Sequence, residues 1–314
     1  IGDILATIFQ NEQLLKNMTF TTSIQEYTSM NEVFFSPRWN SIIEDCNKQA
    51  PTSLPILVLL YYDDFRKYKM APGSCGGMYM SILNMDRDLT SKPENIFCLG
   101  LINNEDEYWD VMNDIVTQLE ELYEPHTVES PISPCGKLSV VTRLGLFLAD
   151  TPQRNETCTM KSHQAGTFCI HCMGNILNSL QFPDPRKGEQ SIEGHCIRNV
   201  TTYRRHCREW LDAATVGEKK DISRRYGIKP RLVDGVYHEN PFFRLFDLYG
   251  FDIFQDSPVD FFHNAIIGIF PTMIDLINNL VGKTRSESIG KFVLEYKFPK
   301  GGPLNWSYKE YWKG

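Results

Sequence analysis

Apolar, β-branched and aromatic residues form a run over residues 54–65, and two carboxylates, Asp63 and Asp64, end the run abruptly. A continuous apolar run of this length predicts a strand buried inside a sheet. Two shorter runs, at residues 78–85 and 96–102, each follow turn-forming glycine or proline residues and predict two further strands. This part of the chain therefore predicts three successive strands.

The next two patterns are an amphipathic helix and a fourth strand. Residues 104–123 place large apolar side chains at helical spacing among acidic ones. Residues 138–150 are again apolar and end in a carboxylate, Asp150. This order, with an acid after the first and fourth strands, resembles the opening of the ribonuclease-H-like fold, in which those strands are neighbours. We therefore expect an α/β fold, a mixed sheet flanked by helices, in which Asp63 and Asp150 meet at the strand ends.

After Asp150 the pattern changes to cysteines, histidines and basic residues. This change predicts a cysteine- and histidine-rich helical insertion, after which the core resumes in an apolar helix from Pro258. Because the chain opens with Ile1 and stops inside an aromatic, basic run, we expect it to be part of a longer protein. The predicted organisation is a helical lead-in at 1–53, the first part of the core at 54–150, a zinc-binding and basic insertion at 151–241, and a truncated C-terminal helical part of the core at 242–314.

Composition narrows the class of protein. The 314 residues have the apolar, aromatic and charged content of a globular protein, and no apolar run is long enough to cross a bilayer. Nine cysteines, two of them in a Cys-x-x-Cys spacing, indicate a reducing compartment and metal binding rather than disulfides. The net charge of −7 argues against a protein that binds nucleic acid over its whole surface.

Positive charge is nevertheless concentrated between Arg198 and Arg231, where ten basic residues face four acidic ones. Aromatic residues lie among these arginines, and this combination suits a DNA backbone with unpaired bases nearby. An ordinary solvated helix face explains the same residues equally well. The candidate DNA-binding residues are Arg204, Arg205, Arg208, Arg224 and Arg225.

Asp63, Asp64 and Asp150 are candidates for a catalytic metal site. Phosphoryl transfer by two Mg²⁺ or Mn²⁺ ions needs carboxylates that hold the ions about 3.5–4 Å apart. The alternative is that these acids are solvated turn residues that follow strands. Asp260 and His263 are further candidates because one helical turn puts them on one helix face. For this pair, a helix-capping aspartate and a hydrogen-bonded core histidine are the alternative.

Cys169 and Cys172 form the Cys-x-x-Cys pair, which can place two thiolates on one tetrahedral Zn²⁺. The closing pair of ligands usually comes from a distant helix or loop. Two buried free cysteines are the alternative, because a single Cys-x-x-Cys pair is not decisive. Candidates for the closing ligands are His163, His171, His195, Cys196, His206 and Cys207.

Several stretches between about residues 54 and 270 resemble, in order, the CACTA-type (En/Spm) DNA transposase family. They are similar to the family's first catalytic strand, its next two strands, its second acid, its zinc-knuckle entry and its Asp-x-x-His helix. They lie at residues 62–65, 76–84 with 92–97, 149–152, 162–172 and 258–264. The resemblance rests on the order of these motifs, since none of them is specific alone.

The resemblance implies roles for individual acids. Asp63 is favoured over Asp64 because the family's catalytic acid precedes its phenylalanine by two positions. Asp260 and His263 would lie close to the active site. The third catalytic acid would follow the Trp-Lys pair near the end of the chain, just beyond the last residue, and Glu310 is a weaker candidate.

The resemblance also implies how the zinc site is closed. The family uses two histidines three positions apart, and that register falls on Tyr203 and His206, so one expected histidine is a tyrosine here. Cys196 or Cys207 would then substitute for it.

The implied function is that of a transposase catalytic domain, which cleaves DNA at transposon ends and transfers the freed strand. It implies Mg²⁺ or Mn²⁺ at the acids, structural Zn²⁺, DNA as the partner and location in the nucleus. It allows a homo-oligomer, and it implies neither a membrane nor a small-molecule substrate. One alternative is a domesticated, transposase-derived protein that binds DNA or a partner without nuclease activity. Another is a zinc-stabilised structural module, for which Asp63 and Asp150 would not cluster.

Overall fold

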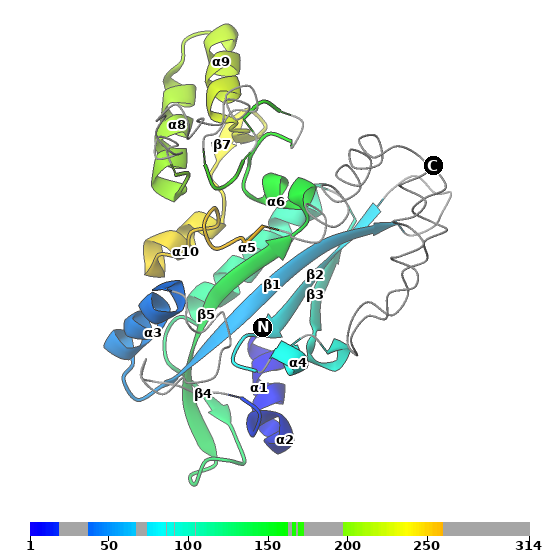
Figure 1. Cartoon of the computed structure of the whole chain (residues 1–314), viewed down its shortest axis with the longest axis vertical. Helices are drawn as coiled ribbons and strands as arrows, with labels where there is room; N and C mark the ends of the chain where they lie inside the picture. Colours follow the sequence, from blue (N-terminus) through cyan, green and yellow to red (C-terminus); the bar gives the residue numbers. More distant parts are fainter. Residues whose placement is uncertain are drawn as a thin grey trace, which may run out of the picture. The chain divides into compact units, whose positions relative to one another are not determined.

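A mixed sheet with helices on both faces forms the centre of the chain (Figure 1). The computed structural model describes residues 1–18, 37–66, 74–85, 87–90, 92–103, 105–162, 165–167, 169–172 and 197–259. The elements up to the last strand of the sheet are α1 (Gly2–Gln10), α2 (Glu12–Leu15), α3 (Pro37–Gln49), β1 (Leu54–Arg66), β2 (Ser74–Ile82), α4 (Arg87–Thr90), η3 (Pro93–Asn95), β3 (Phe97–Ile102), α5 (Glu105–Glu121), β4 (His126–Glu129) and β5 (Lys137–Ala149). They are followed by α6 (Thr151–Thr157), α8 (Val200–Asp212), α9 (Val216–Tyr226), β6 (Arg231–Val233), β7 (Val236–His238) and α10 (Phe242–Tyr249).

The sheet has the strand order β3-β2-β1-β5-β4. Strand β1 is antiparallel to β2, β2 to β3 and β4 to β5, whereas β1 and β5 run parallel. The predicted α/β class, with a mixed sheet flanked by helices, is confirmed. The sequence pattern does not predict β4, because a strand of four residues is too short to show an alternation.

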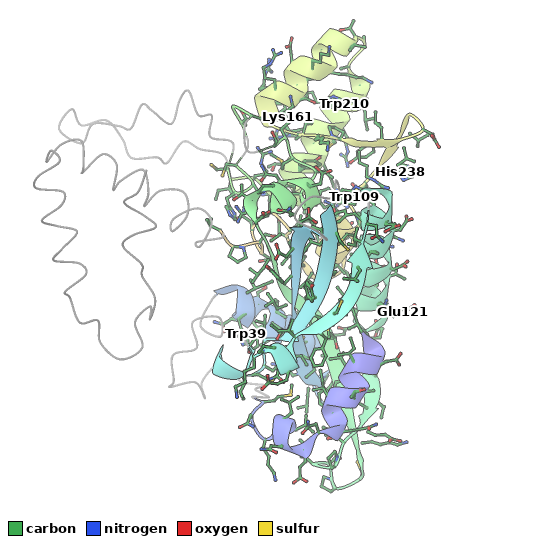
Figure 2. The ribbon with its side chains drawn as sticks, turned by 90° about the vertical axis from the view of Figure 1, so that its right-hand side faces the viewer. Trp39, Trp109, Glu121, Lys161, Trp210 and His238 are labelled. Atoms are coloured by element: carbon green, nitrogen blue, oxygen red, sulfur yellow. The ribbon has the colours of Figure 1, made fainter. Side chains whose placement is uncertain are left out.

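Both faces of the sheet are covered, which explains why β1 is apolar along most of its length. On one face Ile56 and Val58 are completely buried in a cluster with α1 and α5. On the other face Leu57 belongs to a second cluster with Trp39 of α3. Trp39 and Glu121 mark α3 and α5 in Figure 2. Each fully buried apolar side chain of this size contributes about 1.5–3 kcal/mol.

A bulge in β5 decides which face its last residues take. The register passes from Val58 opposite Leu144 to Leu59 opposite Leu146, so β5 contains one extra residue at this point. Before the bulge Leu144 packs on the α1 and α5 side, and beyond it Phe147 does. The alternation of β5 is therefore reversed from the bulge onward.

The chain after β5 packs on the same core. Helix α10 contacts α5, and Phe242 and Phe243 at its start are completely buried. Tyr203 of α8 is in the same buried cluster, and its hydroxyl donates a hydrogen bond to the carbonyl oxygen of Thr159 at 2.8 Å. Residues 1–258 form one compact unit. Helix α8, in the predicted basic stretch, is thus packed on the core of the sheet.

Two further features concern the chain beyond α9. Strands β6 and β7 form a two-stranded hairpin that the sequence pattern does not predict. The helix predicted from Pro258, with Asp260 and His263, lies outside the described residues. Within the described ranges, no helix has both the length and the apolar character needed to cross a bilayer.

Candidate functional site

The ends of β1 and β5 bring two of the predicted acids into register. Tyr62 of β1 is paired with Ala149 of β5, and the next residues along the two strands are Asp63 and Asp150. Adjacent strands lie about 4.8 Å apart. Asp63 lies on the face of β1 opposite that of Tyr62, whereas Asp150 lies just beyond β5 as the N-cap of α6. The two aspartates are therefore neighbours at one end of the sheet.

Asp64 is fixed by two hydrogen bonds. The Tyr62 hydroxyl donates to Oδ1 at 2.6 Å, and the Gln153 side-chain amide donates to Oδ2 at 3.0 Å. The backbone N–H of Gln153 donates to Oδ1 of Asp150 at 2.9 Å, because Asp150 is the N-cap of α6. Gln153 thus links the carboxylates of Asp64 and Asp150.

Tyr62 is a buried hydrogen-bond donor in this group. Burial raises the pKa of its hydroxyl, and the hydrogen bond to Asp64 raises it further, so the hydroxyl stays protonated. Its ring lies edge-on to Tyr108, with ring centroids 5.1 Å apart. The phenol lies where a side chain on Gly76 would be, since a Cβ there would stand 2.2 Å from the Tyr62 oxygen. A glycine at position 76 is therefore required for this arrangement.

Tyr79 takes the equivalent position near Asp63. A Cβ on Gly77 would lie 2.4 Å from the Tyr79 oxygen, and Gly77 is the strand partner of Asp63. Burial raises the pKa of Tyr79, and Asp63 is among the charges that add to this rise. Sequence reasoning missed both tyrosines. The signal for them in the sequence is the Gly-Gly pair at positions 76 and 77, because a side chain at either position would clash with one of the rings.

The other predicted acids cannot be placed with this pair. Asp260, His263 and Glu310 lie outside the described residues. Among the residues that the structure describes, no group of three or more histidine, cysteine, aspartate and glutamate side chains is arranged to hold a metal ion. Asp63, Asp64 and Asp150 are the predicted acids that lie within the described residues, and they do not form such a group.

Cys169 and Cys172 lie beside Arg198. Arg198 Nε donates to the carbonyl oxygen of Cys169 at 3.0 Å, and its backbone N–H donates to the carbonyl oxygen of His171 at 2.9 Å. Both cysteines are half-buried, whereas Arg198 is completely buried. Its Nη1 and Nη2 atoms have no hydrogen-bond partner among the described residues. Burial lowers the pKa of Arg198. Nearby groups raise this pKa in part, and the largest of these contributions comes from Cys169.

His206 has the properties of a neutral nitrogen ligand. It is buried in α8, and its ring stacks on Tyr226 of α9 with centroids 3.7 Å apart. Burial, with the charges of Arg205 and Arg198, lowers the pKa of His206 to about 4. Its Nδ1 atom is buried and has no hydrogen-bond partner in the described part of the chain. Arg198 interacts electrostatically with His206 and with both cysteines.

Cys207 follows His206 but has different surroundings. It is buried in the core beside Tyr203 and Tyr237. Burial raises the pKa of Cys207 to about 11, so its thiol is neutral. These contacts favour a core role over metal binding. The other candidate ligands His163, His195 and Cys196 lie outside the described residues.

The predicted DNA-binding arginines have unequal surroundings. Arg204 is held by two carboxylates, with Nε 2.8 Å from Glu239 Oε1 and Nη1 2.6 Å from Asp247 Oδ1. These contacts favour a structural role for Arg204 over phosphate binding. Arg224 forms an exposed ion pair with Asp221 at 3.0 Å, which is weak. The remaining candidates are exposed, namely Arg205, Arg208 and Arg225.

The two groups of residues suit different metals. Asp63 and Asp150 offer carboxylate oxygens, which hard ions such as Mg²⁺ and Mn²⁺ prefer. Cys169, Cys172 and His206 offer sulfur and imidazole nitrogen, which suit Zn²⁺. No protein-family model and no curated protein sequence matches this chain. Inference about function therefore starts from these residues.

Proposed function

We propose that the chain is the ribonuclease-H-like catalytic core of a CACTA-type DNA transposase. It would cleave DNA at transposon ends and join the freed strand to a target. The strand order supports this proposal, because β3, β2 and β1 are successively antiparallel and β5 returns parallel to β1. Sites in such open sheets lie at the ends of the central strands. Here β1 carries Asp63 and Asp64 near its end at Arg66, and Asp150 directly follows the neighbouring strand β5.

The observation that carries the proposal is the register of β1 and β5, which makes Asp63 and Asp150 neighbours. We infer that these two carboxylates hold Mg²⁺ or Mn²⁺. Such ions, when bound, activate the attacking water or 3′-hydroxyl and stabilise the leaving oxygen. Asp64 acts as a positioning residue, because its oxygens accept hydrogen bonds from Tyr62 and Gln153.

Gln153 has a defined part in this arrangement. Its backbone N–H holds Oδ1 of Asp150, and its side chain holds Asp64. The two strand ends are thereby tied to the first turn of α6. A metal site needs such supporting hydrogen bonds to keep its ligands oriented.

We further propose a structural zinc site at Cys169 and Cys172, with the other ligands supplied by residues outside the described part of the chain. The support is chemical. The buried Nη atoms of Arg198 have no partner among the described residues and lie near the two cysteines, and zinc-bound thiolates accept such hydrogen bonds. Removal of zinc by a chelator should lower the melting temperature of the wild type. The Cys169→Ser/Cys172→Ser variant should contain less zinc and lose this response.

The nuclease proposal is tested at the acids. Asp63→Asn and Asp150→Asn should each abolish Mn²⁺-dependent DNA cleavage and weaken Mn²⁺ binding measured by calorimetry. Asp64→Asn should lower cleavage by about 10- to 100-fold, the usual effect of losing a supporting residue. Asp110→Asn, at an exposed position of α5, is the matched control and should change neither.

Two outcomes would decide against this proposal. Full cleavage by both the Asp63 and the Asp150 variants would refute the nuclease assignment. A wild-type protein that binds DNA and Mn²⁺ without cleaving DNA would favour the alternative, a transposase-derived protein that has lost nuclease activity.

A further inference from the structure

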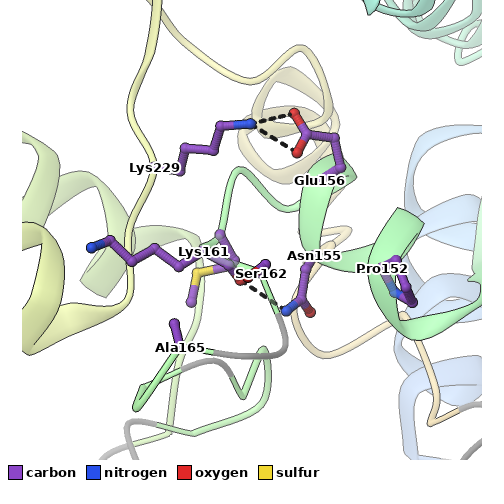
Figure 3. A pocket seen from close by; sticks show the side chains of 8 residues that line it. Pro152, Asn155, Glu156, Lys161, Ser162, Ala165 and Lys229 are labelled. Carbon is purple, nitrogen blue, oxygen red and sulfur yellow. Dashed lines mark hydrogen bonds and ion pairs between the residues drawn. The ribbon is translucent and has the colours of Figure 1, made fainter.

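Two adjoining cavities lie beside α6 and continue along α8 and α9. The first has a volume of about 630 Å³, and Pro152 and Asn155 of α6 contribute to its lining (Figure 3). The second has a volume of about 480 Å³ and includes Trp210 of α8. Lys161 and Lys229 line both cavities. The two cavities are therefore parts of one groove, which we call the lysine groove.

A short antiparallel pairing centred on Met160 and Ile228 fixes the two shared lysines. Both central residues are buried, with exposures of 1% and 0%. Because side chains alternate along extended backbone, the flanking Lys161 and Lys229 are directed to the opposite side. Gly227 makes the pairing possible, since it ends α9 with φ of 68° and a Cβ there would lie 1.8 Å from a backbone oxygen.

The lysine groove is positively charged. Four lysines line it, whereas Glu156 is the one carboxylate among the described lining residues. Lys229 pairs with Glu156 at 3.0 Å, as the dashed lines in Figure 3 show. The other three lysines have no ion pair with the described part of the chain, namely Lys161, Lys219 and Lys220. A protein with a net charge of −7 thus gathers positive charge along one groove.

Apolar surface lies among these lysines. The ammonium of Lys219 stands 4.6 Å from the centre of the Trp210 ring. Val216 and Leu232, which also line the groove, are 70% and 47% exposed. Lys161 and Trp210 are labelled in the same part of the chain in Figure 2. Aromatic and aliphatic surface beside cations is what a single nucleic-acid strand needs, because its bases are free to stack while its phosphates need positive charge.

We propose that the lysine groove binds a single strand of DNA, with phosphates on the lysines and a base or sugar against Trp210. This inference rests on the proposed action on DNA. The lysines come from three segments along the groove, namely Lys161 after α6, Lys219 and Lys220 in α9, and Lys229 after α9. A row of charges of this kind fits an extended polyanion better than one small anion. A duplex fits less well because its paired bases could not reach Trp210.

The groove also has a defined relation to the candidate acids. Asp150 is the N-cap of α6, and Asn155 of the same helix lines the first cavity. Five residues of helix span about 8 Å. A strand held in the lysine groove therefore lies one to two helical turns from the ends of β1 and β5, which is close enough to continue into the acidic site.

The test compares two triple variants with the same loss of charge. Lys161→Ala/Lys219→Ala/Lys220→Ala alters the groove, and the control replaces three exposed lysines elsewhere, Lys48, Lys92 and Lys137. The probe is a fluorescently labelled single-stranded oligonucleotide, titrated at several salt concentrations. The groove variant should lose about tenfold or more in affinity, with a salt slope shallower by about 2, because each phosphate contact on a single strand contributes about 0.7. The control should keep both values, and circular dichroism shows whether each variant is folded.

Further measurements separate the competing ligands. Trp210→Leu should weaken single-strand binding roughly tenfold, as expected for a lost stacking contact. The same variant should lose less affinity for a duplex of the same sequence. Equal affinities of the two triple variants for the single strand would overturn the proposal. Full displacement of the strand by millimolar inorganic phosphate would also overturn it, because the groove would then be a small-anion site.

The groove and the nuclease can fail independently. If wild type cuts no DNA but the groove variant loses single-strand binding, the nuclease proposal fails and the groove proposal stands. If wild type cuts DNA but binds no single strand, the groove proposal fails alone.

Discussion

Replacement of Gly76 by alanine should damage the acidic site and destabilise the fold together. The new Cβ would stand 2.2 Å from the Tyr62 oxygen and 2.6 Å from two ring carbons. Tyr62 cannot yield easily, because its ring is buried against Tyr108 and its hydroxyl is bonded to Asp64 at 2.6 Å. The phenol must therefore move, and its hydrogen bond to Asp64 is then lost.

The size of the effect follows from three contributions. Overpacking of a buried site costs about 1–3 kcal/mol. Loss of a hydrogen bond to a charged group costs about 1.5–3 kcal/mol. Alanine in place of a strand glycine stabilises the fold by about 0.5–1 kcal/mol. Gly76→Ala should therefore lower the free energy of unfolding by about 3 kcal/mol.

Urea unfolding followed by tryptophan fluorescence measures this change as a shift of the midpoint at constant slope. Gly100→Ala in β3 is the matched control, because its nearest side-chain atom lies 3.9 Å from the new Cβ, and it should be neutral or slightly stabilising. In a Tyr62→Ala background Gly76→Ala should also become neutral, since the clashing ring is gone. The reasoning is refuted if Gly76→Ala and Gly100→Ala behave alike, or if Gly76→Ala costs the same with and without Tyr62.

Two further substitutions test the packing by the same unfolding measurement. Asp45→Ala should cost about 2 kcal/mol, because it leaves the buried Arg143 without its carboxylate, whereas Asp221→Ala, which breaks an exposed pair, should cost less than about 0.5 kcal/mol. Gly227→Ala should cost at least about 2 kcal/mol, since it combines a left-handed backbone with a clash against a carbonyl oxygen. Gly235→Ala, left-handed but in open space, should cost only about 1–2 kcal/mol. Equal costs within either pair would contradict the assigned contacts.

The α/β class and most of the strands could be predicted because their signals are local. The apolar runs of β1 and β5 are visible in the sequence, although β1 continues beyond the two acids to Arg66. The order of the elements then limits the possible sheets to few. The bulge in β5 could not be predicted, because one extra residue is visible only when two strands are aligned.

The contacts around the acids were beyond sequence reasoning for a related reason. Gln153 and Tyr62 are ordinary residues of a short helix and a strand, and their role depends on where Asp64 stands. Charge counting also could not show which arginines have acidic partners. Arg204 is paired with acids 35 and 43 residues away in the sequence. The lysines of the groove come from segments that only the pairing of Met160 with Ile228 brings together.

Two completely buried arginines, Arg143 and Arg198, show how burial can point to a missing partner. The guanidinium of Arg143 donates to Asp45 and to the carbonyl oxygen of Tyr123, and it lies 3.8 Å from the centre of the Tyr123 ring. Arg198 has the same burial, yet its Nη1 and Nη2 atoms have no partner among the described residues.

A buried guanidinium whose N–H groups lack acceptors costs several kcal/mol, so a folded chain must supply negative charge or acceptors close to the Nη atoms of Arg198. Cys169 and Cys172 are near it, and as neutral thiols they are weak acceptors. As zinc-bound thiolates they would be charged acceptors, and the cation would offset part of their charge. The unsatisfied Nη atoms of Arg198 thus support the proposed zinc site independently of the Cys-x-x-Cys spacing.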